Sequence, residues 1–145
     1  MWEDVEQEGS TPLRMSVVLK IDRRRRIVVS TFYGEVSDDE ILRHGQDIQA
    51  DPDFNPNFDE IVDFTSVTRS LVSEAALGML ASNKSIFSSQ TRHIIVTPAD
   101  RPFKLAQKYK ALTAVTRPRL FVVRTLDEAY QLLGIESPGN VRLDP

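Results

Sequence analysis

The chain contains no cysteine and few residues of the other types on which common catalytic motifs depend. Without cysteine there is no disulfide scaffold, no cysteine nucleophile and no thiolate metal site. The only histidines, His44 and His93, each lack a second histidine at the spacing of a metal site. The six glycines are too scattered to form a dinucleotide-binding loop or a P-loop, and no glycine flanks a serine as in a hydrolase elbow. We therefore expect a protein that is not an enzyme, with no metal and no cofactor.

Long hydrophobic runs are also missing, since no stretch approaches the roughly 18 apolar residues of a membrane helix. The N-terminus is acidic where a signal peptide would be basic and then apolar. Together with the lack of cysteine, this predicts a cytoplasmic protein. Residues 1–12 hold four acidic side chains and no basic one, and removing these four charges from the net charge of −3 leaves +1 on the rest. A nearly neutral body gives no reason to expect nucleic acid as a partner.

The 145 residues predict one domain with a single core. Residues 1–14 carry few apolar side chains, so we expect a flexible acidic arm there. The folded domain is expected over residues 15–134. Residues 135–145 include Pro138, Gly139 and Pro145 and are expected to form a loose tail.

Short apolar runs alternate with amphipathic segments along the domain. Two adjacent strands are followed by helix and strand in turn, in the order ββαβαβαβα, which predicts an α/β fold with a mixed five-stranded sheet and about four helices. Gly34 is expected to end the second strand. The expected strands are residues 16–21, 27–33, 61–64, 93–97 and 119–123; the expected helices begin near residues 37, 73, 102 and 125, and the second of them runs to Phe87.

Four consecutive arginines, residues 23–26, lie between the first two strands. Their simplest interpretation is a solvated hairpin tip that also discourages pairing at the sheet edge. The alternative is weak contact with an acidic membrane surface. The two histidines have similarly plain interpretations, because His44 is expected to be solvated on a helix and His93 to be an edge residue at the start of a strand.

The strand-to-helix segment of residues 63–73 is the strongest candidate for a functional surface. A buried strand ends in Asp63 and is followed by hydroxyl side chains just before a helix. Ligands of open α/β sheets bind at such strand ends, and a helix N-terminus favours a phosphate. Helix capping alone would also explain these residues. The candidate binding residues are Thr65, Ser66, Ser70 and Ser73.

Three short stretches, together with the order of elements, resemble STAS domains of the SpoIIAA type, and more closely the SpoIIAA-like family of stand-alone bacterial proteins. These stretches are residues 19–22, 51–56 and 61–65, and the likeness extends over roughly residues 16–134. The resemblance implies a regulatory module that binds an unknown protein partner, with a homodimer left open. In anti-sigma-factor antagonists of this fold a serine at the start of the second helix is phosphorylated; only Ser73 matches it here, beside Glu74 and without the usual glycine.

The same family is similar in fold to CRAL-TRIO lipid carriers, which implies a second function. The protein would then carry or sense a small apolar molecule or lipid. Plain core packing explains the same side chains more simply, because helical apolar stripes normally pack on a sheet. The candidate ligand-binding residues are Leu77, Leu80, Phe87, Phe103 and Tyr109.

Overall fold

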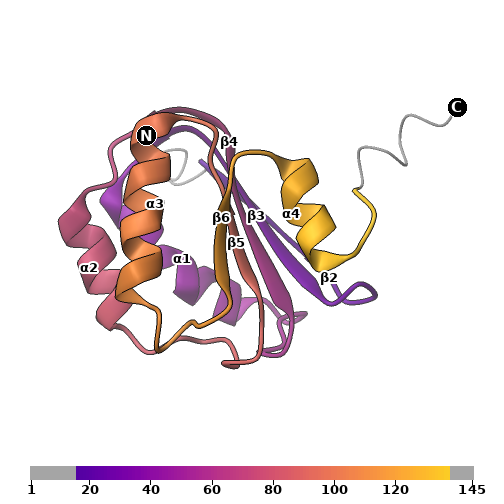
Figure 1. Ribbon diagram of the computed structural model, residues 1–145. Coiled ribbons are helices and arrows are strands. Elements are labelled where there is room, and N and C mark those ends of the chain that lie inside the picture. The colour runs from indigo at the N-terminus through magenta and orange to yellow at the C-terminus, as the bar shows by residue number, and fades with distance from the viewer. Residues whose placement is uncertain (1–15, 138–145) are drawn as a thin grey trace, which may run out of the picture.

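The computed structural model describes residues 16–137 and shows a five-stranded sheet between two layers of helices (Figure 1). The expected arm, residues 1–14, and residues 138–145 of the expected tail lie outside the described residues. In chain order the elements are β2 (Val17–Asp22), β3 (Ile27–Val36), α1 (Asp38–Ala50), β4 (Asp59–Ser70), α2 (Glu74–Ser82), β5 (His93–Val96), α3 (Asp100–Leu112), β6 (Leu120–Val123) and α4 (Leu126–Leu133).

The strands lie side by side in the order β2-β3-β4-β5-β6. The hairpin strands β2 and β3 are antiparallel, whereas β3, β4, β5 and β6 pair in parallel. The prediction of an α/β fold with a mixed five-stranded sheet and four helices is therefore confirmed for the part of the chain that the structure describes.

Helices cover both faces of the sheet: α1, α2 and α3 lie on one side and α4 on the other (Figure 1). On the α4 side, Ile61 and Ile94 pack against Ala129 and Leu133. On the other side, Phe32 forms a second core with residues from α1 and α2. Burial on both faces explains why β4 and β5 contain continuous apolar runs instead of an alternating pattern.

Local sequence signals fix the ends of the helices. The Thr125 hydroxyl accepts a hydrogen bond from the Glu128 backbone N–H (3.2 Å), and Glu128 accepts in return from the Thr125 N–H (3.1 Å). This reciprocal pair starts α4. Gly134 ends it with a left-handed φ of 69°, a conformation that costs glycine little and other residues more.

Three expected boundaries were wrong. β3 does not end at Gly34 but continues to Val36, with an irregularity in its pairing where Gly34 takes a φ of 68°. Residues 65–70, expected as a turn, extend β4. The helix α2 ends at Ser82, well before Phe87. In the two strands, polar or glycine-containing sequence conceals the extent of the element, because pairing with a neighbouring strand overrides local preference.

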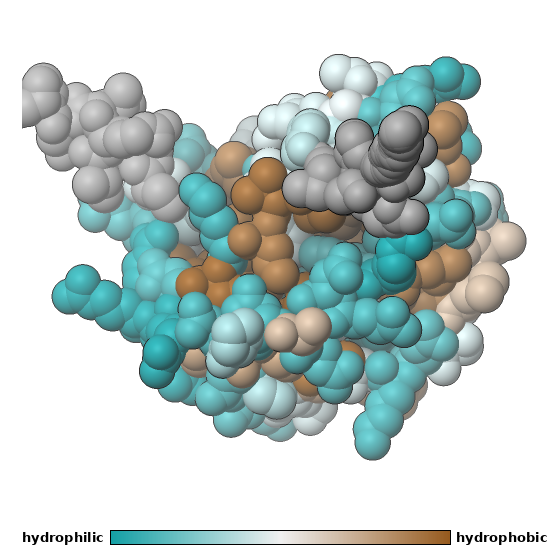
Figure 2. Space-filling model, turned by 180° about the vertical axis from the view of Figure 1, so that it is seen from behind, coloured by the Kyte–Doolittle hydropathy of each residue, from teal (hydrophilic) through white to brown (hydrophobic). Residues whose placement is uncertain are grey.

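The surface seen from behind is mostly hydrophilic, with hydrophobic residues exposed between polar neighbours in the middle of the view (Figure 2). Among the described residues, the large apolar side chains that are exposed lie on different segments of the chain. They include Leu71, Met79, Leu112 and Val115. Within residues 16–137, no helix has the length and apolar character needed to cross a membrane.

Candidate functional site

A cavity of about 310 Å³ lies between the sheet and the helices α1, α2 and α3. Its size is near the lower limit for small-molecule pockets, about 300–1,000 Å³. One part of its wall is apolar and comes from all three helices and the sheet. The apolar side chains there include Leu42, Phe64, Leu77, Leu80 and Leu105.

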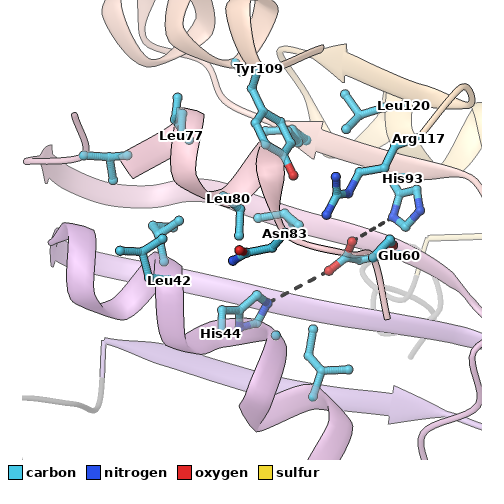
Figure 3. A pocket seen from close by; sticks show the side chains of 18 of the residues that line it. Leu42, His44, Glu60, Leu77, Leu80, Asn83, His93, Tyr109, Arg117 and Leu120 are labelled. Carbon is cyan, nitrogen blue, oxygen red and sulfur yellow. Dashed lines mark hydrogen bonds and ion pairs between the residues drawn. The ribbon is translucent and has the colours of Figure 1, made fainter. Parts of the chain in front are cut away.

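Polar side chains gather at the other end of the cavity (Figure 3). Glu60 of β4 lies between His44 of α1 and His93 of β5, with Arg117, from the segment between α3 and β6, reaching toward them. The cluster forms near the amino ends of β4 and β5, because Glu60 and His93 are partners in the parallel register. It therefore lies away from the carboxyl end of β4, where the sequence placed the candidate surface.

Glu60 and His93 form a buried, hydrogen-bonded pair. The Nδ1 atom of His93 lies 2.9 Å from Oε1 of Glu60. Burial by itself would raise the pKa of Glu60, but the hydrogen bond and charge of His93, together with the charges of His44 and Arg117, hold that pKa below its ordinary value. Glu60 is therefore an ionised acceptor, and Nδ1 of His93 donates to it.

The other side of the His93 ring is also fixed. Its Nε2 lies 3.0 Å from the Thr91 hydroxyl, which donates its own hydrogen to the Ser88 carbonyl (2.8 Å). The ring of Phe87 packs edge-on against His93, with centroids 4.8 Å apart. His93 is thus held by contacts on three sides, and it fixes the Glu60 carboxylate in turn.

His44 differs because its ring nitrogens have no hydrogen-bond partner among the described residues. Its ring packs against Phe32 at 5.1 Å, and its Nε2 lies 4.0 Å from Oε2 of Glu60, beyond hydrogen-bond distance. Burial lowers the pKa of His44, although the charges of Glu60 and Asp47 oppose the shift. A neutral imidazole with an unmet donor and acceptor therefore faces the cavity.

Tyr109 and Arg117 complete the polar end. Burial raises the pKa of Tyr109 to about 12, with the charge of Arg117 opposing the shift, so the phenol keeps its hydrogen at physiological pH. The Arg117 guanidinium lies 5.7 Å from the centre of the Tyr109 ring, within cation–π range. The cavity thus combines an apolar end with an end that offers both donors and acceptors.

Four of the apolar residues singled out from the sequence lie together at this cavity. Leu77, Leu80, Phe87 and Tyr109 all line it. Phe103 is not among its lining residues; instead the Arg124 guanidinium covers its ring at 4.1 Å.

The hydroxyl residues are more dispersed. Thr65 and Ser66 are exposed on β4, and Ser70, at the end of that strand, reaches the wall of the cavity. Ser73 is the N-cap of α2: its hydroxyl accepts from the Ala76 N–H (3.1 Å) and donates to Asp38 (2.8 Å). A phosphate on Ser73 would face Asp38 and Glu74, two carboxylates of like charge.

Both histidine predictions were wrong. His44, expected to be solvated, is 9% exposed, and His93, expected at an edge, is 4% exposed on a strand with neighbours on both sides. Glu60 and Arg117 were not singled out at all. Glu60 and His93 do stand directly before the apolar runs of β4 and β5, which was the one available signal, but their pairing depends on a strand register that one sequence does not reveal.

No protein-family model, no curated protein and no solved structure matches this chain. Within residues 16–137, no group of three or more His, Asp or Glu side chains is arranged to hold a metal ion.

Proposed function

We propose that the protein binds a small, mainly apolar molecule in the cavity between the sheet and α1–α3, as a carrier or sensor in a bacterial cytoplasm. The observation that supports this most directly is the division of the cavity into an apolar end and a polar end with an unpartnered, buried His44. Pockets of this composition, mostly apolar with a few convergent polar groups, are typical of small-molecule sites. The resemblance to the SpoIIAA-like family, and through it to lipid carriers, agrees with this proposal.

Gly45 offers a direct test. It lies on α1, lines the cavity, and a Cβ atom built on it meets no atom within 4 Å. Gly45→Leu should therefore fill part of the cavity without a clash at Cβ, and should stabilise α1 by up to about 1 kcal/mol because glycine is a poor helix former. We expect it to abolish or strongly weaken ligand binding.

Gly78→Leu is the matched control. Gly78 also lies in a helix, α2, with no atom within 4 Å of a built Cβ, but it is not among the residues that line the cavity. Native mass spectrometry of freshly purified protein and titration with 1-alkanols would measure binding. In the unaltered protein, affinity should rise about fourfold with each added methylene until the cavity is full, since each contributes about 0.8 kcal/mol. Equal binding by both glycine variants would contradict the proposal.

A second candidate function, a protein-binding module, is favoured by the end of β4. Residues 65–70 pair with β3, but β5 pairs only with residues 60–63, so the opposite edge of this segment has no strand partner within residues 16–137. Such an edge can accept an extended peptide. A pull-down with a Ser66→Pro variant would test it, because proline removes a backbone donor. An unchanged set of partners would contradict this function.

A further inference from the structure

Two unsatisfied polar atoms at the polar end face one another. Oε1 of Glu60 is taken by His93, which leaves Oε2 directed to His44, with Nε2 of His44 4.0 Å away (Figure 3). His44 is buried, with 9% of its surface exposed, and its ring nitrogens have no partner in residues 16–137. A hydrogen bond between the pair is excluded by distance, so a third atom that bridged them would give each a partner.

We propose that the ligand carries a hydroxyl group that bridges His44 Nε2 and Glu60 Oε2. This inference rests on the proposed ligand binding and adds the chemical class: a neutral alcohol with an apolar body. An oxygen about 2.8 Å from both atoms would subtend an angle of roughly 90° between them, within the broad range of hydroxyl hydrogen bonds. The hydroxyl hydrogen goes to the carboxylate, which only accepts, and an oxygen lone pair receives the N–H of His44.

Other head groups fit this pair of atoms less well. A carboxylate has no hydrogen to give Glu60 and carries the same charge, so it would be repelled. The Glu60 carboxylate favours the His44 tautomer with its hydrogen on Nε2, which faces that carboxylate. An ammonium has no lone pair to accept this hydrogen, and Arg117 lines the same cavity with a like charge. An ether accepts from His44 but leaves Oε2 of Glu60 unmet. With the His44 hydrogen on Nε2, a group with both a donor and an acceptor is needed to satisfy both sides.

Four probes of similar size separate these cases: 1-octanol, its isomer heptyl methyl ether, octanoate and octylamine. Titration calorimetry on the unaltered protein should show 1-octanol binding about tenfold tighter or more than each of the other three. The ether and octanoate lose the hydrogen bond to the Glu60 carboxylate, whereas octylamine loses the hydrogen bond from His44 and is repelled by Arg117. Equal affinities for 1-octanol and the ether would overturn the hydroxyl inference and leave the proposed function standing. If no probe binds, and Gly45→Leu changes nothing, the proposed function itself fails.

Glu60→Gln gives a sharper test of the bridge. His93 still needs an acceptor, so the amide oxygen should take the place of Oε1 and the NH₂ group that of Oε2. A ligand in the cavity would then face a hydrogen-bond donor at the position where Glu60 offers an acceptor. We expect 1-octanol to lose its preference and the ether to bind at least as tightly. Glu74→Gln, an exposed carboxylate on α2 that pairs with Lys108 outside the cavity (2.7 Å), is the matched control and should leave the order of affinities unchanged. A Glu60→Gln variant that keeps the preference for 1-octanol would contradict the bridge.

Discussion

Glu60 is the residue through which most of the polar end is connected. It receives a hydrogen bond from His93 and faces His44, while its charge influences the pKa of both His44 and Tyr109. A buried ion pair contributes little compared with apolar residues of the same size, because desolvation offsets the attraction. Breaking such a pair from one side is costly, however, since it leaves a charge buried without its partner.

The first prediction concerns this asymmetry. His93→Phe should lower the free energy of unfolding by about 3–5 kcal/mol, because Glu60 loses its donor. The double variant His93→Phe with Glu60→Leu should recover much of that loss, since no charge remains to be buried. Urea unfolding measures both. A double variant less stable than the single one would contradict this account.

The second prediction concerns pH and His44. Burial lowers the pKa of His44 in the folded protein, whereas an unfolded histidine keeps a pKa of about 6.5. Below that pH the unfolded chain therefore binds more protons than the folded one, and stability falls as the pH falls. The lowered pKa of Glu60 acts in the same direction at lower pH, where its carboxylate is protonated.

His44→Phe removes the histidine contribution and leaves His93 in place. The loss of melting temperature between about pH 7.5 and pH 5.5 should be smaller in this variant than in the unaltered protein. Differential scanning calorimetry at both pH values would measure it. An equal loss in the two proteins would show that His44 does not titrate differently on unfolding.

At the scale of single elements, Ser73 connects two helices, because it caps α2 and donates to Asp38 in the first turn of α1. Ser73→Ala should lower the free energy of unfolding by about 0.5–2 kcal/mol, the usual cost of a lost cap. Ser66→Ala, on the exposed part of β4, is the control and should change stability by no more than about 0.5 kcal/mol. Chemical denaturation would measure the free energy of unfolding of both variants. Equal losses would mean that the hydrogen bonds of Ser73 add no more stability than the exposed hydroxyl of Ser66.

Elements with strong local signals were predictable. The reciprocal cap at Thr125 and the glycine at position 134 fixed α4, and apolar runs such as residues 94–96 marked the central strands. The extension of β4 through residues 65–70 was not predictable, because its side chains are polar and its partner, β3, is far away in the sequence. Gly34 misled for a similar reason: a positive φ within an irregular pair interrupts a ladder without ending the strand.

The candidate site shows the same limit more strongly. Helical spacing identified Leu77, Leu80 and Tyr109, which line the cavity. This spacing indicates that a side chain faces the sheet, but it does not indicate whether a cavity lies beside that side chain. Glu60 and His44 come from different elements and meet only when α1 packs over the sheet. Neither the burial of such polar groups nor their proximity is encoded in the local sequence pattern.

At the scale of the whole molecule, ligand binding should stabilise the fold. A ligand that binds only the folded state at 100 times its dissociation constant raises the free energy of unfolding by about 2.7 kcal/mol. We expect 1-octanol to raise the melting temperature of the unaltered protein in this way. Gly45→Leu should melt higher than the unaltered protein without ligand, yet gain little from 1-octanol. A gain as large as that of the unaltered protein would place the binding site outside the cavity.

The position of the Glu60–His93 pair has a consequence for folding as well as for ligands. The two residues face each other across parallel strands, and side chains alternate between the two faces of a sheet. If the register of β5 shifted by one residue, His93 would point toward the α4 side of the sheet. The Glu60 carboxylate would then be buried on the other side without its donor. An uncompensated charge is very unfavourable there, so this single contact disfavours other registers of β4 and β5. The apolar residues beside it would tolerate several registers, and the pair selects one of them.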